Sequence, residues 1–261
     1  MATRFSILGS GSAGNCSFIE TEKTKILVDA GFSCSQIRQR LAAIGRVPED
    51  LDGILVTHEH GDHIKGLKIM QSKYGIPVVA NRLTHESIER HFKANLECHR
   101  FHTGDSFEIG DIEIDSFSVP HDAQDPVGFV IRTPTSSLGF LTDLGHVTKS
   151  IEQKVDGVQI LVLETNYDLQ MLEEDMCRPW SVKQRIMSRH GHLSNDEAGE
   201  LAGRLASKRM EHLYLCHLSR DCNTPAKAMD CVTKSLIRET LALPEVYSTD
   251  QTTPSDWLIL P

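Results

Sequence analysis

The segment LVTHEHGDHIKG, residues 55–66, concentrates side chains that bind metal ions or move protons. It contains three histidines and an aspartate within six positions: His58, His60, Asp62 and His63. Imidazole and carboxylate groups are ligands for zinc, manganese and iron, and one or two of them would suffice for ordinary hydrogen bonding. The pattern H-x-H-x-D-H therefore predicts a metal centre, and a surface loop with accidental histidines is the alternative.

The expected local structure separates these side chains into two pairs. Residues 53–57 are apolar and predict a strand ending at a sheet edge, where His58 and His60 would project to the same side. Asp62 and His63 follow a glycine at which a helix is expected to begin, so they diverge from the first pair. The arrangement predicts two adjacent divalent ions.

A centre of two ions needs more ligands, and three further residues lie where strand patterns stop. Each follows an apolar run and precedes a polar or glycine-containing turn: His121 after IDSFSVP, Asp143 after LGFLT and His217 after HLYLC. Functional groups often occupy such positions, since the strand behind them is rigid. Taken singly, each would be interpreted as an ordinary polar residue whose hydrogen-bonding groups have partners. Together with the first cluster, they are the expected remaining ligands.

Strand and helix patterns alternate along the chain. Strands are predicted at residues 5–8, 16–21, 25–31, 53–58, 77–80, 127–134, 137–145, 158–165 and 212–217, with a hairpin at 106–121. Helices are predicted at residues 33–45, 62–75, 196–209 and 225–242. This order predicts an α/β fold in which helices flank two sheets, with a single domain over residues 1–261.

Composition restricts the class of protein. A hydrophobic content of 39% with 24% charged residues is that of a soluble globular protein, and no run approaches the roughly 20 apolar residues that span a bilayer. The first residues lack a secretory signal, and the seven cysteines form no C-x-x-C pair, so we expect a cytoplasmic protein with reduced thiols. A net charge of −9 argues against nonspecific coating of nucleic acid but permits a local basic track.

The pattern H-x-H-x-D-H, followed by a separated His, Asp and His, resembles the metallo-β-lactamase superfamily over essentially the whole chain. The resemblance implies a four-layer αββα sandwich with the site at one edge. It implies one metal held by His58, His60 and His121, a second held by Asp62, His63 and His217, and Asp143 as the bridge. It also implies that Asp29, in KILVDAG, orients a ligand histidine; a turn or cap aspartate is the alternative.

Several segments narrow the resemblance. The sequence around the third motif is VPHDAQDPVGFVI and lacks the GHTPG-like pattern of lactamases and thioesterases, which favours the phosphodiesterase branch. SGSAGNC (10–16), ETNYD (164–168), RPWSVKQRI (178–186) and RHGHLSNDEA (189–198) resemble the WalJ/YycJ-type nucleases. Only 73 residues separate Asp143 from His217, so the β-CASP domain that ribonuclease J inserts there is not expected.

The resemblance also implies a route for the proton that a leaving oxygen needs. Glu and His positions similar to Glu164 and His192 form a proton relay in ribonuclease Z-like enzymes. Asp62 would act beside them, as a ligand that also takes part in catalysis. The alternatives are a strand-end charge at Glu164 and a surface histidine leading into a helix at His192.

Substrate contacts are expected at a helix start and at a basic segment. Ser194 and Glu197 form an S-x-x-E capping box, so Ser194 and Asn195 cap the helix, bind phosphate, or do both. Residues 178–192 contain no acidic residue and four basic ones: Arg178, Lys183, Arg185 and Arg189. With Trp180 to stack on a base, they suit a single-strand channel. A solvated helix face is the alternative.

Family likeness also places Ser12 or Asn15 near the metals; otherwise SGSAGNC is a turn between strands. The residues and the resemblance together predict a phosphodiester hydrolase with two divalent ions (zinc, manganese or iron), and the resemblance implies that it acts as a 5′→3′ exonuclease on DNA ends. A phosphodiesterase for small molecules or cyclic nucleotides is the second hypothesis. A non-catalytic regulatory protein that retains the fold is the third.

Overall fold

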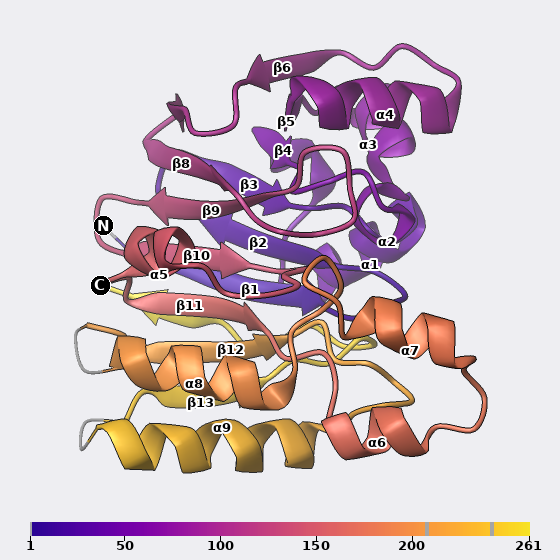
Figure 1. Ribbon diagram of the computed structural model, residues 1–261. Helices are drawn as coiled ribbons and strands as arrows, with labels where there is room; N and C mark the ends of the chain where they lie inside the picture. Colours follow the sequence, from indigo (N-terminus) through magenta and orange to yellow (C-terminus); the bar gives the residue numbers. More distant parts are fainter. Residues whose placement is uncertain (1, 207–208, 241–242) are drawn as a thin grey trace.

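The computed structural model describes residues 2–206, 209–240 and 243–261 (Figure 1). In these ranges the strands form two seven-stranded sheets. The first sheet contains, in spatial order, β14 (Leu258–Leu260), β1 (Thr3–Gly9), β2 (Cys16–Glu20), β3 (Lys25–Val28), β4 (Gly53–Leu55), β5 (Val78–Asn81) and β6 (Cys98–Phe101). The second contains β13 (Glu245–Ser248), β12 (His212–Cys216), β11 (Ile160–Glu164), β10 (Ser137–Leu141), β9 (Val127–Arg132), β8 (Ile112–Ser118) and β7 (Ser106–Ile109).

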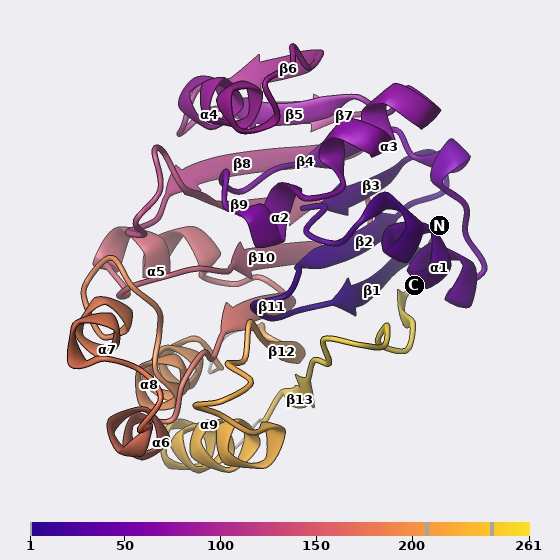
Figure 2. The same cartoon turned by 90° about the vertical axis from the view of Figure 1, so that its right-hand side faces the viewer.

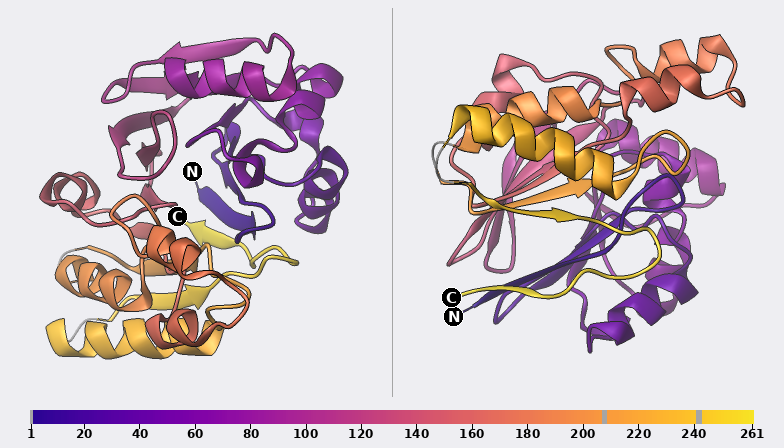
Figure 3. Two further views of the ribbon diagram at one scale, coloured as in Figure 1. Left: turned by 45° about the vertical axis from the view of Figure 1, so that its right-hand side comes forward. Right: turned by 90° about the horizontal axis from the view of Figure 1, so that it is seen from below.

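Helices lie on the outer sides of both sheets (Figure 2). On the side of the first sheet are α1 (Cys34–Ala43), the 3₁₀ turn η1 (Pro48–Asp50), α2 (Gly61–Ile64), α3 (Leu67–Tyr74) and α4 (Arg82–Phe92). On the side of the second are α5 (Lys149–Val155), α6 (Leu169–Glu174), α7 (Trp180–Ile186), α8 (Asn195–Ala206) and α9 (Pro225–Glu239). The right-hand view of Figure 3 shows the two sheets face to face, which confirms the predicted αββα sandwich.

Alternation along the strands creates separate apolar layers. In β11, Ile160 and Val162 belong to the layer between the two sheets, whereas Leu161 and Leu163 pack in the layer shared with α5, α8 and α9. A third layer lies between the first sheet and helices α1, α3 and α4. Because successive strand side chains point to opposite faces, a strand covered on both sides must be apolar throughout, as these runs are.

Most of the predicted elements are present, and one is wrong in detail. The predicted helix at 62–75 is divided into α2 and α3 at Gly66. The Gly66 amide donates to the Ala30 carbonyl (2.8 Å), and a Cβ on Gly66 would lie 2.5 Å from the Phe32 carbonyl oxygen. The chain therefore bends where its backbone packs against the segment after β3. The predicted ends of two other helices include 207–208 and 241–242, which lie outside the described residues.

Parallel pairing brings the functional strand ends together. Strands β10, β11 and β12 are mutually parallel, and β3, β4 and β5 are parallel in the other sheet. The carboxyl ends of parallel strands meet at one edge of a sheet, and this edge is where the predicted ligands follow their strands. Across the described ranges, no helix has the length and apolar character needed to cross a membrane. All seven cysteines are free, as expected for reduced thiols.

Candidate metal centre

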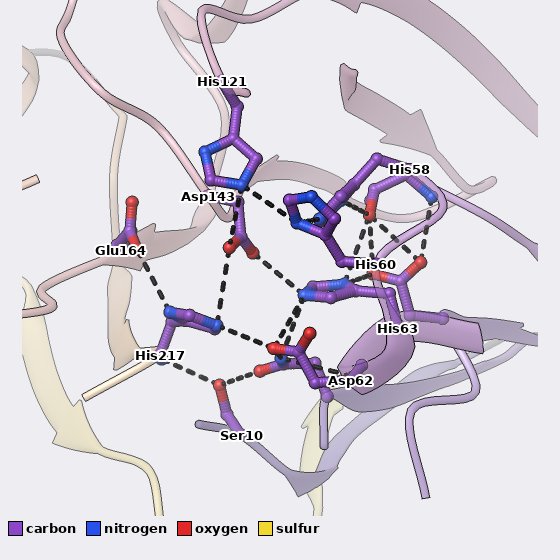
Figure 4. Close-up of polar contacts among 12 residues, drawn as sticks. Ser10, His58, His60, Asp62, His63, His121, Asp143, Glu164 and His217 are labelled. Carbon is purple, nitrogen blue, oxygen red and sulfur yellow. Dashed lines mark hydrogen bonds and ion pairs between the residues drawn. The ribbon is translucent and has the colours of Figure 1, made fainter. Parts of the chain in front are cut away.

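All seven predicted ligand side chains converge at the edge where the strand ends meet (Figure 4). Two of the sets whose nitrogen and oxygen atoms lie within 4.8 Å of one another are His58 with His60 and His121, and Asp62 with His63 and His217. We call these the first and second triads. They are the two ligand sets that the sequence resemblance implies.

The ring nitrogens of the first triad face one another, but they carry too few protons to be joined by hydrogen bonds. Thr57 donates its hydroxyl proton to Asp29, so it accepts from His58 Nδ1 (3.0 Å), which leaves a lone pair on His58 Nε2. His121 Nδ1 donates to the Gly191 carbonyl (2.9 Å), which leaves a lone pair on its Nε2. Both Nε2 atoms approach His60 Nδ1, at 3.0 and 3.3 Å. One nitrogen carries at most one proton, so a cation fits this triad better than hydrogen bonding does.

The second triad is fixed from behind in the same way. His63 Nδ1 donates to Asp29 (2.7 Å), as the resemblance implies, and the Thr57 amide holds that carboxylate at 2.9 Å. The Asp62 carboxylate lies 3.6 Å from His63 Nε2 and 3.3 Å from His217 Nε2. A carboxylate behind a ligand histidine sets its tautomer and raises its basicity, so Asp29 is suited to this positioning role.

Asp143 lies between the triads. Its carboxylate oxygens are 3.0 Å from His63 Nε2, 3.5 Å from His217 Nε2 and 3.6 Å from His121 Nε2. The side chain is buried, and among the described residues Oδ2 has no hydrogen-bond partner of proper geometry. A buried carboxylate oxygen without a partner is costly. A pair of divalent cations would satisfy it, so the residues present fit the implied metal ions.

The electrostatics of the centre also suit a cation. Burial lowers the pKa of His58 well below its ordinary value and that of His121 below it, so both imidazoles are neutral. Burial opposes charge on His63 and His217 too, but Asp143 and the other carboxylates outweigh it and raise both pKa values well above the ordinary range. Those two histidines hold the pKa of Asp143 well below its ordinary value. The centre thus attracts positive charge.

Glu164 and His192 are brought together behind the second triad. Glu164 is fully buried, and its Oε1 lies 2.7 Å from His192 Nδ1 and 3.1 Å from His217 Nδ1. Its Oε2 accepts from the backbone amides of Leu144 (2.6 Å) and Leu193 (3.2 Å). Charge and hydrogen bonding from Glu164 outweigh burial and raise the pKa of His192. With Nδ1 held, Nε2 of His192 is the atom left to exchange a proton.

We expect Glu164→Gln to lower kcat by about a hundredfold, because the three hydrogen bonds from His192, Leu144 and Leu193 require an acceptor and an amide nitrogen cannot accept. At least one donor would be left facing an NH2 group, at a cost of about 1–3 kcal/mol. The assays are hydrolysis of bis(p-nitrophenyl) phosphate and thermal unfolding, with Glu113→Gln, on an exposed strand position, as control. A kcat within threefold of wild type would remove Glu164 from the mechanism.

Asn15 reaches the centre from the turn SGSAGNC, as expected. Its amide nitrogen lies 3.0 Å from His63 Nε2 and 3.4 Å from the Asp62 carboxylate. Ser10, which the sequence did not single out, donates to the Asn15 side-chain oxygen (2.9 Å) and accepts from the backbone amide of His217 (2.8 Å). Ser12 is exposed on the same turn.

Some of the residues expected to bind substrate are buried, and others lie at the surface. Ser194 and Glu197 form the predicted capping box, with the Ser194 hydroxyl donating at 2.8 Å and accepting from the Glu197 amide at 3.2 Å. Asn195 is buried and exchanges side-chain hydrogen bonds with Asn223. Lys183 is also buried and donates to the Glu173 carbonyl (2.8 Å), so its ammonium does not join a surface track.

The other residues of the basic segment are at the surface. Arg185 pairs with Asp122 (2.6 Å), which follows the candidate ligand His121, and Arg189 lies 3.2 Å from His146. Trp180 is 58% exposed at the start of α7. Arg178 is bound by two carboxylates and so is partly neutralised: Asp175 and Asp221.

One conformational feature was not found by sequence reasoning. Asp29, Asp143 and His217 all adopt positive φ, at 62°, 53° and 54°. Each lies one or two residues after a strand, where the chain turns; Asp143 and His217 reach the centre from there, and Asp29 reaches His63. Asp, Asn and His tolerate this region better than most residues, which is the signal that could have found it.

Comparison with known proteins places this centre in a family. The beta-lactamase superfamily domain matches residues 24–218. The chain belongs to the metallo-β-lactamase superfamily. Within the superfamily, the chain is 36% identical over 257 residues to exodeoxyribonuclease YycJ of Bacillus anthracis, with 97% of each chain covered. It is 37% identical over 255 residues to exodeoxyribonuclease WalJ of Streptococcus pneumoniae, with 96% of this chain and 94% of that protein covered.

A solved structure supports the fold. The metallo-beta-lactamase fold protein YhfI from Bacillus subtilis superposes with a TM-score of 0.72 at 16% identity, covering 97% of this chain and 99% of its own. The superfamily and its WalJ/YycJ-type branch, predicted from the motifs, are confirmed. The chain is a metal-dependent hydrolase of this superfamily, and its His/Asp cluster has the side chains needed to bind divalent metal ions.

Proposed function

We propose that this protein is a 5′→3′ exonuclease that hydrolyses phosphodiester bonds at DNA ends with two divalent ions, zinc or manganese. The observation that carries the proposal is the convergence of two triads on the buried carboxylate of Asp143. Relatives of nearly equal length that are named exodeoxyribonucleases support the choice of DNA.

Each triad would hold one ion, with Asp143 between them. When bound, such ions activate water as a nucleophile and stabilise the charge on the scissile phosphate. Asp29 and the Gly191 carbonyl keep His63 and His121 in the tautomers that direct Nε2 to the centre. His192, held through Nδ1 by Glu164, would give a proton from Nε2 to the leaving oxygen.

The surface beside the first triad would bind the strand. Arg185 and Arg189 supply positive charge there, and the exposed ring of Trp180 provides a face on which a base can stack. The Asp122 carboxylate now pairs with Arg185, so a phosphate would compete for that guanidinium. This arrangement suits a single strand better than a folded RNA, because no long arm or inserted domain surrounds it in the described residues.

The test is a digest of single-stranded DNA labelled at either end, with chelator-treated protein reconstituted with zinc or manganese. The stripped protein should be inactive, and added metal should restore activity. Release of the 5′ label as mononucleotide at the earliest times is expected, with the 3′ label passing through progressively shorter strands. Early mononucleotide release from the 3′ end would reverse the proposed polarity.

Cyclic mononucleotides and bis(p-nitrophenyl) phosphate serve as competing substrates in the same assay. Faster hydrolysis of cyclic nucleotides than of DNA would favour the small-molecule phosphodiesterase. Metal binding without hydrolysis of any of these substrates would favour the regulatory protein.

A further inference from the structure

A cavity of about 510 Å³ lies between α1, the end of α2 and the segment 250–254. Its volume is within the range of ligand-binding pockets. The charged residues that line it are all basic: Arg40, Lys65 and Arg220. In a chain with 36 acidic and 27 basic residues, a pocket lined only by cations calls for an explanation.

Among the described residues no ion pair neutralises the three cations, although the nearby Asp250 carboxylate interacts electrostatically with Arg40. In the part of the chain that the structure describes, none of them has a carboxylate within salt-bridge distance. The Arg40 guanidinium donates to two backbone carbonyls, those of Leu8 and Gln251, and lies over the Phe32 ring. Lys65 and Arg220 are exposed. Arg40 is thus held in the wall by its hydrogen bonds, and the other two are exposed charges at the rim.

Other cavities on the molecule differ in this respect. Three surface cavities of 330 to 550 Å³ each include at least two carboxylates in their walls. In two of those cavities the walls contain both basic and acidic side chains, and in the third the only charged side chains are acidic. The cavity beside α1 alone among these four has charge suited to an anion.

The turn 10–15 separates this cavity from the metal centre. On one side, Asn15 contacts His63, and Ser10 contacts the backbone of His217. On the other side, Ala13 lines the cavity, and a Cβ on Gly11 would lie 2.5 Å from the Gln251 amide nitrogen. Lys65 follows His63 by two residues, and Arg220 follows His217 by three. The cavity and the second triad therefore lie on opposite sides of this turn.

An amide in the wall also lacks partners. Both polar atoms of the Gln251 side chain are buried, and neither has a hydrogen-bond partner among the described residues. Such atoms cost free energy unless a ligand or water satisfies them. Gln251 lines the cavity together with the three cations.

We propose that this cavity binds the terminal 5′-phosphate of the DNA strand that is cut at the metal centre; the inference rests on the proposed exonuclease function. A terminal phosphate carries close to two negative charges at neutral pH, whereas an internal phosphodiester carries one, so several unpaired cations favour the terminus. Arg185 and Arg189 lie on the side of the first triad, and the cavity lies on the side of the second. A strand crossing the centre would place its body on α7 and its end in the cavity.

The experiment uses the double variant Lys65→Gln/Arg220→Gln, because both side chains are exposed and their loss should not impair folding. The matched control is Arg38→Gln/Lys68→Gln, with equally exposed residues on α1 and α3 that do not line the cavity. Substrates are one single-stranded oligonucleotide with a 5′-phosphate or a 5′-hydroxyl, and bis(p-nitrophenyl) phosphate, which has no terminus to bind.

Wild type should show a lower KM for the 5′-phosphorylated strand. The double variant should raise that KM about tenfold, as expected for lost charge-assisted hydrogen bonds, and change the KM of the 5′-hydroxyl strand by less than about twofold. Its kcat on the chromogenic diester should equal that of the control. Equal effects on the two strands would overturn the inference.

Fluorescence anisotropy with the same strands separates this inference from the proposed function. If wild type does not cut DNA, the exonuclease proposal fails, and the intact strands then report binding alone. A preference for the 5′-phosphate that the double variant loses would support the cavity assignment. Equal binding of both strands, or a preference that survives in the double variant, would refute it.

Discussion

Asp143→Asn is expected to lower kcat/KM for phosphodiester hydrolysis by about a thousandfold, equivalent to about 4 kcal/mol of activation free energy. Asp143 contacts His63, His121 and His217, so its carboxylate is the group shared by both triads. Asparagine keeps the shape and tolerates the observed φ of 53°, whereas alanine would add backbone strain. The substitution therefore removes charge with little change in conformation.

Metal content is the second measurement on this variant. We expect it to retain less metal than wild type after dialysis, because a neutral amide oxygen is a weaker ligand for a divalent ion than a carboxylate. Asp230→Asn is the control, since Asp230 lies on α9 and pairs with Lys234. Unchanged hydrolysis and unchanged metal content in Asp143→Asn would show that the bridging assignment is wrong.

Gly31→Ala is expected to lower the midpoint of thermal unfolding by about 10 °C or more, as a loss of about 4 kcal/mol would in a protein of this size. A Cβ on Gly31 would lie 1.6 Å from the Asp62 carbonyl oxygen and 2.6 Å from the Asn15 amide nitrogen. Both atoms are backbone and are hydrogen-bonded to each other at 2.8 Å. Neither can move unless α2 and the turn 10–15 also move.

Gly61→Ala is the matched control, because Gly61 directly precedes Asp62 on the other side of the same contact and a Cβ there would meet nothing within 4 Å. It begins α2, where alanine has the higher helix propensity, so its unfolding midpoint should stay within about 2 °C of wild type. Differential scanning fluorimetry on both metal-loaded proteins is sufficient. Equal midpoints for the two variants would mean that α2 adjusts easily and that the close approach is unimportant for stability.

The convergence of the candidate ligands could be predicted from the sequence because they follow apolar strands. A strand pattern gives both the position of a side chain along the chain and its place at the sheet edge, so His121, Asp143 and His217 were found without knowledge of their contacts. The left-handed conformations of Asp143 and His217 were not predicted: their residue types permit positive φ, but the way the turn closes decides whether it is adopted. Sequence patterns describe strand ends better than the turns that follow them.

Surface chemistry was predicted less well for a physical reason. The sequence of the basic segment 178–192 shows which side chains are charged but not which way they point. Lys183 proves to be buried, with its ammonium against the Glu173 carbonyl. The cationic cavity draws its charges from three positions far apart in the sequence: Arg40, Lys65 and Arg220. Even the nearest two, Arg40 and Lys65, are 25 positions apart, so no short sequence motif contains both and only tertiary packing reveals the group.

Because β14 pairs with β1, the first sheet is completed late in the synthesis of this sequence. Thr3 lies opposite Leu260, so the outer strand of the first sheet is added only when the end of this sequence has left the ribosome. Every candidate metal ligand precedes that point by more than 40 residues. The segment 250–254, which closes the cationic cavity, emerges just before β14. A nascent chain can therefore assemble its hydrolytic machinery before it acquires the wall that would select a strand terminus.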